Sequence, residues 1–158
     1  MKTLLTESGR KKIQEELHHL LTVEKQKAIQ EIADAKDRGG IEENAEFDIA
    51  KDELNKLQQK IAKLQETLSN SSIVDPKNVD LSKVSLLTTV LVLNKMNDKE
   101  FQFSIVPDNE INVKLGRISS SSPIGSGLMN KRIGEASTIV IPSGSIEFEI
   151  VNILPYED

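Results

Sequence analysis

Four acidic residues follow a pair of glycines, Gly39 and Gly40, in the first half of the chain. They are Glu42, Glu43, Glu46 and Asp48. Carboxylate oxygens suit Mg²⁺, which usually takes one or two protein carboxylates and completes its octahedron with water and phosphate oxygens. The acids could also have a simpler role, because acids in the first turn of a helix interact favourably with its positive end. The residues alone leave both interpretations open.

Other residues that could do chemistry are poorly placed for it. The serines at 119–122 lack the Gly-x-Ser-x-Gly pattern that surrounds many hydrolase nucleophiles. His18 and His19 are the only histidines, and adjacent residues lack the i,i+4 spacing of a helical metal pair. We expect the serines to form a loop and a helix cap, and the histidines to face solvent on a helix.

Composition excludes several classes of protein. The 158 residues carry a formal net charge of -5, which argues against a domain that mainly neutralises nucleic-acid phosphates. The absence of cysteine excludes disulfides, thiolate metal sites and a cysteine nucleophile. The longest apolar stretch, residues 86–93, is too short to span a membrane. We therefore expect a soluble cytoplasmic protein without a membrane partner.

The acidic cluster lies between two stretches with helical periodicity. In the second, apolar residues alternate at spacings of three and four, which is typical of a coiled-coil seam. These seam residues are Phe47, Ala50, Leu54, Leu57, Ile61, Leu64 and Leu68. The first stretch has a looser stripe, interrupted by a polar step near Glu24, with Thr6 as the expected N-cap. Its apolar residues are Ile13, Leu17, Leu20, Leu21, Ala28, Ile32 and Ala35.

Paired glycines between the two stretches predict a turn, and folding the chain there aligns the stripes. We therefore expect an antiparallel coiled-coil helical hairpin over residues 1–75, with the acidic cluster at its tip. The polar run at 69–72 and Asp75-Pro76 mark the end of this domain.

Beyond residue 76 the apolar period changes to two. We expect strands at 84–93, 100–106, 137–141 and 145–153, with a hairpin turn at Pro142-Ser143-Gly144. Ser122 should cap a short helix at 123–130, with Pro123 in its first position. Residues 76–158 thus predict a small antiparallel sheet with one helix, and the whole chain belongs to the α+β class.

The segment at 32–51, IADAKDRGGIEENAEFDIAK, resembles the tip of bacterial Gre transcript-cleavage factors. The family pattern there is roughly A-x-A-[RK]-x-x-G-D-L-x-E-N-A-E-[YF]-x-x-A-[KR]. The second half agrees in the same order, with Leu-Gly-Arg-Ile-Ser at 115–119, Ser-Pro-Ile at 122–124, Gly-Leu-Met at 127–129 and Pro-Ser-Gly at 142–144. The likeness covers essentially the whole chain, and the GreA branch is the nearer one.

The resemblance implies a coiled-coil hairpin followed by a domain of FKBP-like fold. It also implies a monomeric transcription elongation factor that enters bacterial RNA polymerase through the secondary channel. Carboxylates at the tip would help the polymerase hold a second Mg²⁺ near the nascent RNA 3′ end. The polymerase's own active site then cleaves backtracked RNA, so the factor is not itself an enzyme and binds no cofactor alone.

The chain departs from the family pattern at the tip. The family usually carries an Asp directly after the tip glycine and a Glu three residues later. Glu43 matches that Glu and is the implied catalytic ligand of Mg²⁺, whereas Gly40 stands at the Asp position. Glu42 is a candidate substitute for the missing acid, although one helical residue turns a side chain by about 100°. A second function therefore stays open, in which the chain occupies the channel and modulates or inhibits polymerase without efficient cleavage.

Overall fold

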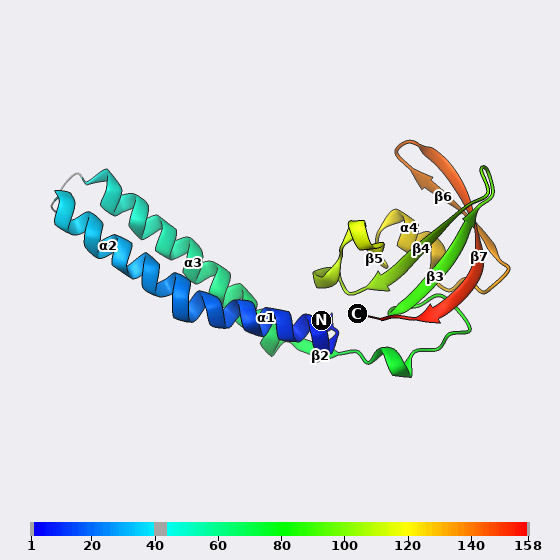
Figure 1. Cartoon of the computed structure of the whole chain (residues 1–158), viewed down its shortest axis with the longest axis horizontal. Helices are drawn as coiled ribbons and strands as arrows, with labels where there is room; N and C mark the ends of the chain where they lie inside the picture. The colour runs from blue at the N-terminus through cyan, green and yellow to red at the C-terminus, as the bar shows by residue number, and fades with distance from the viewer. Residues whose placement is uncertain (1, 40–43, 158) are drawn as a thin grey trace. The chain divides into compact units, whose positions relative to one another are not determined.

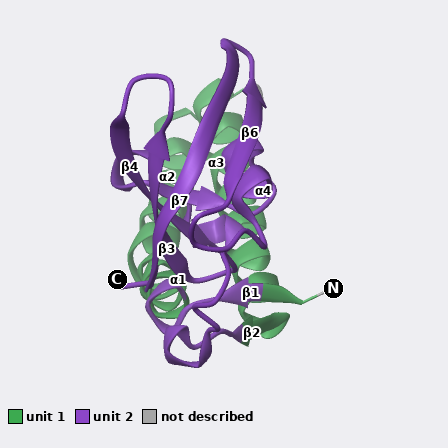
Figure 2. Ribbon diagram, turned by 90° about the vertical axis from the view of Figure 1, so that its right-hand side faces the viewer, with its two compact units in different colours: residues 1–3, 10–72 green, residues 4–9, 73–158 purple. Residues whose placement is uncertain are grey.

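The computed structural model of the chain describes residues 2–39 and 44–157. The chain forms two compact units, which Figure 2 colours separately. One consists of Met1–Thr3 and Arg10–Ser72, and the other of Leu4–Gly9 and Ile73–Asp158. The fold is α+β as predicted, with a helical hairpin in the first unit and a five-stranded sheet in the second. No helix among the described residues is long and apolar enough to cross a membrane.

The predicted hairpin is confirmed. Helix α1 (Glu7–His19), a π-helical turn at Leu20–Glu24 and helix α2 (Lys25–Gly39) follow one another, and α3 (Ala45–Ser69) returns beside α2 (Figure 1). Two short strands, β1 (Thr3–Leu5) and β2 (Ser71–Ile73), pair in a small separate sheet.

The seam between the helices follows the predicted apolar positions. Every predicted seam residue of α3 is buried or half-buried, and Ile61 is only 7% exposed. The stripe of the first stretch is likewise buried or half-buried, apart from the exposed Leu21. Glu16 and Lys60 form a 3.2 Å salt bridge between α1 and α3. The hairpin is thus held by one narrow apolar seam with charged residues along its flanks.

The interruption predicted near Glu24 is a π-helical turn. Seam positions are four residues apart from Leu20 through Glu24 to Ala28, and successive steps of four drift about 40° each around an ideal α-helix. A π-helical turn accommodates the extra residue, and the Lys25 N–H donates to the Leu20 carbonyl five residues earlier. The Thr22 hydroxyl donates to the His18 carbonyl at 2.7 Å, which satisfies a backbone acceptor near this irregular turn.

The second unit is built on a sheet with the strand order β5-β4-β3-β7-β6. Its elements are β3 (Thr88–Asn94), β4 (Lys99–Val106), β5 (Arg117–Ser119), α4 (Pro123–Leu128), β6 (Ala136–Ile141) and β7 (Gly144–Pro155). The main core is formed by Val84, Val90, Val92, Ile105, Ile118, Leu128, Ile139, Phe148, Ile150 and Ile153. The predicted short helix is confirmed, because Ser122 Oγ accepts the Gly125 N–H at 3.0 Å.

The sheet differs from the prediction in two places. Strand β5 was not predicted, and it pairs parallel to β4 in a sheet expected to be antiparallel, because the connection at 107–116 returns the chain to the same end of the sheet. The strand predicted from residue 84 begins only at Thr88. Leu87 has a φ of 63°, so the chain bends there, and its N–H donates to the Ile105 carbonyl at 2.7 Å.

A charge in the seam should unfold the hairpin. We expect Ile61→Asp to lower the stability of the helical unit by about 3 kcal/mol or more, since an unpaired carboxylate would replace a buried apolar side chain. The exposed Gln59 provides the control Gln59→Asp, which should change stability by less than about 0.5 kcal/mol. Thermal unfolding followed by helical circular dichroism measures both. Equal melting curves for the wild type and Ile61→Asp would show that Ile61 does not hold the seam.

Candidate functional site at the hairpin tip

Asn44 links the two helices at the tip. Its side-chain oxygen accepts the Phe47 N–H at 3.2 Å, which makes Asn44 the N-cap of α3. Its side-chain amide donates to the Ala35 carbonyl at 2.7 Å, near the end of α2. This second bond reaches across to the last part of α2, which ends at Gly39. One side chain therefore caps α3 and ties its start to α2.

Gly39 permits this arrangement because it stands in close contact with Asn44. A β-carbon added at Gly39 would lie 2.8 Å from Asn44 Nδ2, closer than real Cβ contacts. A larger residue at position 39 would therefore have to displace the Asn44 side chain from its place between the two helices.

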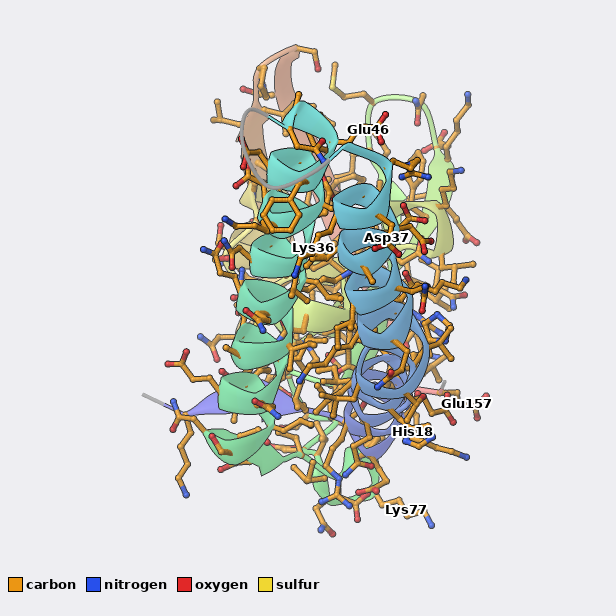
Figure 3. The ribbon with its side chains drawn as sticks, turned by 90° about the vertical axis from the view of Figure 1, so that its left-hand side faces the viewer. His18, Lys36, Asp37, Glu46, Lys77 and Glu157 are labelled. Atoms are coloured by element: carbon orange, nitrogen blue, oxygen red, sulfur yellow. The ribbon has the colours of Figure 1, made fainter. Side chains whose placement is uncertain are left out.

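The charges at the tip complement the helix ends. Lys36 and Arg38 lie in the last turn of α2, and Glu46 and Asp48 lie in the first turn of α3. Figure 3 views the hairpin from its tip and labels Lys36, Asp37 and Glu46 there. Arg38 Nε donates to Glu46 Oε2 at 2.9 Å, which joins the two helices a second time. Both side chains are exposed, so this salt bridge contributes at most about 1 kcal/mol.

The predicted acidic cluster is thus divided. Glu46 and Asp48 are helix-end acids, and Glu46 is already held by Arg38. The predicted site residues Glu42 and Glu43, together with Gly40, lie outside the described residues, between Gly39 and Asn44. In the described parts of the chain, no three His, Asp or Glu side chains are grouped to hold a metal ion.

Comparison with protein families assigns both halves of the chain. The family model "Transcription elongation factor, N-terminal" of GreA/GreB matches residues 3–73, and "Transcription elongation factor, GreA/GreB, C-term" matches residues 78–155. The chain belongs to the GreA/GreB family of transcription elongation factors. The resemblance of the tip segment to Gre factors is thereby confirmed.

Two relatives of this GreA/GreB family member are themselves named as GreA elongation factors. The transcription elongation factor GreA of Flavobacterium johnsoniae is 43% identical over 94% of each chain. GreA of Chloroherpeton thalassium is 38% identical over 96% of each chain. Among solved structures, GreA factor homolog 1 of Thermus thermophilus aligns with a TM-score of 0.45 and 22% identity, covering 97% of this chain and 99% of that one.

The other residues considered from the sequence have structural roles in this Gre factor. Ser119 is buried and its hydroxyl donates to Asp108 Oδ1 at 2.8 Å, while Ser122 caps α4. His19 lies 3.2 Å from Glu24, five residues along the π-helical turn. The expected cap and solvent-facing roles are confirmed, and the expected loop is confirmed for Ser120 and Ser121, whereas Ser119 ends strand β5.

Two contacts of helix-capping residues were not predicted from the sequence. The predicted N-cap Thr6 is confirmed, because its Oγ1 accepts the Gly9 N–H at 3.0 Å. The unpredicted contact is with Glu110, whose carboxylate accepts both the Thr6 hydroxyl and the Thr6 N–H, the latter at 2.9 Å. The link from Asn44 to Ala35 was not predicted either. Asn44 could have been recognised as an N-cap from its place before an acidic first turn, but its second partner could not.

Removing the Asn44 cap should loosen the start of α3. We expect Asn44→Ala to speed hydrogen exchange of the Phe47 amide about tenfold, which corresponds to a lost cap of about 1.4 kcal/mol. Asn44→Ser should stay within about threefold, because serine also caps. The exposed mid-helix Asn55 provides the control Asn55→Ala, which should leave this amide unchanged. Wild-type exchange in Asn44→Ala would contradict the assigned cap.

Proposed function

We propose that this elongation factor binds bacterial RNA polymerase in the cytoplasm and inserts its hairpin through the secondary channel. There it stimulates the polymerase to cleave backtracked RNA at the nascent 3′ end. In this proposal the factor is not a nuclease. It supplies a carboxylate to an active site that belongs to the polymerase.

The observation that carries this proposal is the position of the acidic residues at the end of a two-helix arm. Helix α3 has 25 residues, which at 1.5 Å per residue corresponds to about 38 Å. Both helix ends at the tip are joined by Asn44 and by the Arg38–Glu46 salt bridge. The described residues on either side, Gly39 and Asn44, thus belong to helix ends that are tied to each other.

Glu43 is the proposed ligand of a Mg²⁺ ion that the polymerase active site supplies. A carboxylate fits this ion, which prefers hard oxygen donors and retains several water molecules. A second metal ion would stabilise the attacking water and the leaving oxygen of the phosphodiester. Glu46 is less suited to be a ligand, because it already forms a salt bridge with Arg38. The factor alone would hold no metal and no other cofactor.

Gly40 makes the proposed site weaker than one with two acids. Substituting Gly40→Asp should raise cleavage of backtracked transcripts several-fold, because it adds charge and an oxygen donor near the Mg²⁺ ion. Glu43→Ala should lower the wild-type cleavage rate by at least about tenfold. Losing a residue that only supports a metal ligand already lowers activity by about that factor, and Glu43 is a proposed ligand itself. The rate of dinucleotide release from stalled complexes, at matched occupancy of polymerase, measures both effects.

Two control variants separate ligation from other effects. Gly40→Ala stiffens the backbone without adding an oxygen, so it should not reproduce the gain of Gly40→Asp. Asp48→Ala removes a neighbouring exposed acid that is neither a proposed ligand nor part of the Arg38–Glu46 link, so cleavage should persist. If Gly40→Asp cleaves no faster than the wild type, the missing Asp at position 40 does not matter, and Glu42 is favoured as the second acid. If the wild type and Gly40→Asp both bind polymerase but neither stimulates cleavage, the factor is instead a regulator that occupies the channel.

The purified factor should not hydrolyse free RNA. We expect no cleavage of a labelled transcript by the factor with Mg²⁺ over a range of concentrations, because the proposed site is completed only by the polymerase. Stalled polymerase with the same factor serves as the positive control. Cleavage of naked RNA that co-purifies with the factor and disappears in Glu43→Ala would overturn this division of roles.

A further inference from the structure

A groove runs along one flank of the hairpin next to its tip. It has a volume of about 490 Å³ and lies between α2 and α3. Its lining residues are Ala28, Glu31, Ala35, Arg38, Glu46, Ile49, Ala50 and Glu53. The physical cause is the choice of small seam residues, since Ala28, Ala35 and Ala50 each fill their place with a single methyl group. A second hollow of about 380 Å³ shares Ala28, Glu31 and Glu53, so the groove continues away from the tip.

Ile49 forms an apolar wall of this groove, and its side chain is exposed to solvent. It is 62% exposed, although it lies between the seam residues Phe47 and Ala50. On the other flank of the seam, Lys51 places its ammonium 5.0 Å from the centre of the Phe47 ring and so shields that side chain. The flank with Ile49 thus combines a hollow with an exposed aliphatic side chain.

The rim of the groove is acidic beside Ile49, whereas the adjoining hollow also carries Lys27, Lys56 and Lys60. Arg38 is neutralised by Glu46, which leaves Glu31 and Glu53 as the remaining charges along the two sides. Glu53 has only a long contact of 3.6 Å with Lys56 in its own helix, between two exposed side chains. Glu31 forms no ion pair with any residue in the described part of the chain. An apolar floor with an acidic rim matches an aliphatic side chain flanked by a cation.

We propose that this groove binds a segment of RNA polymerase that presents an aliphatic side chain next to an arginine or lysine. The proposal rests on the proposed function, which brings the end of the hairpin into the polymerase channel. A helical segment suits the groove, because an apolar residue and a basic residue three or four positions apart lie on one helix face. Seating this segment would fix the depth and rotation of the arm and so help to position residues 40–43.

The test compares polymerase affinity among matched variants of the full-length factor. Ile49→Ser removes the apolar wall, and Ala28→Leu fills the floor with a good helix former. We expect each to raise the Kd for polymerase about tenfold, with helicity and melting temperature close to those of the wild type. Ile29 is 45% exposed on α2 and does not line the groove, so Ile29→Ser should change Kd less than twofold.

Charge is tested in the same way. Glu31→Lys reverses the rim and should weaken binding about tenfold, whereas Asp37→Lys makes the same charge change on the same helix outside the groove. Equal losses for Glu31→Lys and Asp37→Lys would mean general electrostatic attraction and would overturn the groove. Unchanged affinity of Ile49→Ser and Ala28→Leu, with tight wild-type binding, would overturn it while leaving the proposed function intact.

Two further outcomes would also overturn the docking site. Failure of the wild type to bind polymerase would overturn it together with the proposed function. Concentration-dependent self-association of the wild type that Ile49→Ser abolishes, measured by sedimentation, would show that a second copy of the chain occupies the groove in place of a polymerase segment.

Discussion

Burial of a narrow apolar seam between antiparallel helices is the interaction on which the hairpin depends. The two hydrophobic clusters found among the described residues belong to the second unit, so the arm has no comparable core to support it. Its buried apolar residues are few, and include Leu20, Ala35, Ala50 and Ile61. Because so few side chains exclude water, the residue at each seam position affects how well the helices pack. A charge there disrupts the packing, and an alanine leaves a hollow.

The π-helical turn shows how such a seam stays continuous when its spacing does not match an α-helix. The extra residue at Leu20–Glu24 is taken up within the helix instead of in a loop. The half-buried Glu24 that this turn brings to the seam has His19 as its neighbour at 3.2 Å. The first half of the hairpin therefore stays helical from α1 through α2 without a loop.

At the tip, the two helix ends are tied to each other and the residues between the helices are small. Asn44 and the Arg38–Glu46 salt bridge tie the helix ends, while alanines nearby let the helices meet with little side-chain bulk. In the proposed function these features act together, because an arm that delivers one carboxylate must be narrow, tied at its end and held at a defined depth. The acid at residue 43 would contribute the chemistry, and the residues around it would contribute its position.

The sequence by itself determined the helical hairpin, the four longer strands, the short helix and the family, but not the short strands β1, β2 and β5. Helix spacing, the paired glycines and the Thr6 and Ser122 caps are local features, since each depends on residues within a few positions of one another. The motif around Glu43 was recognisable for the same reason. Only the tertiary structure decided the parallel pairing of β5, the bond from Asn44 to Ala35, the contact of Thr6 with Glu110 and the groove beside Ile49. Each of these features joins segments that are distant in sequence. Many residues of the chain could form such hydrogen bonds or line a groove, and the folded packing decides which of them become neighbours.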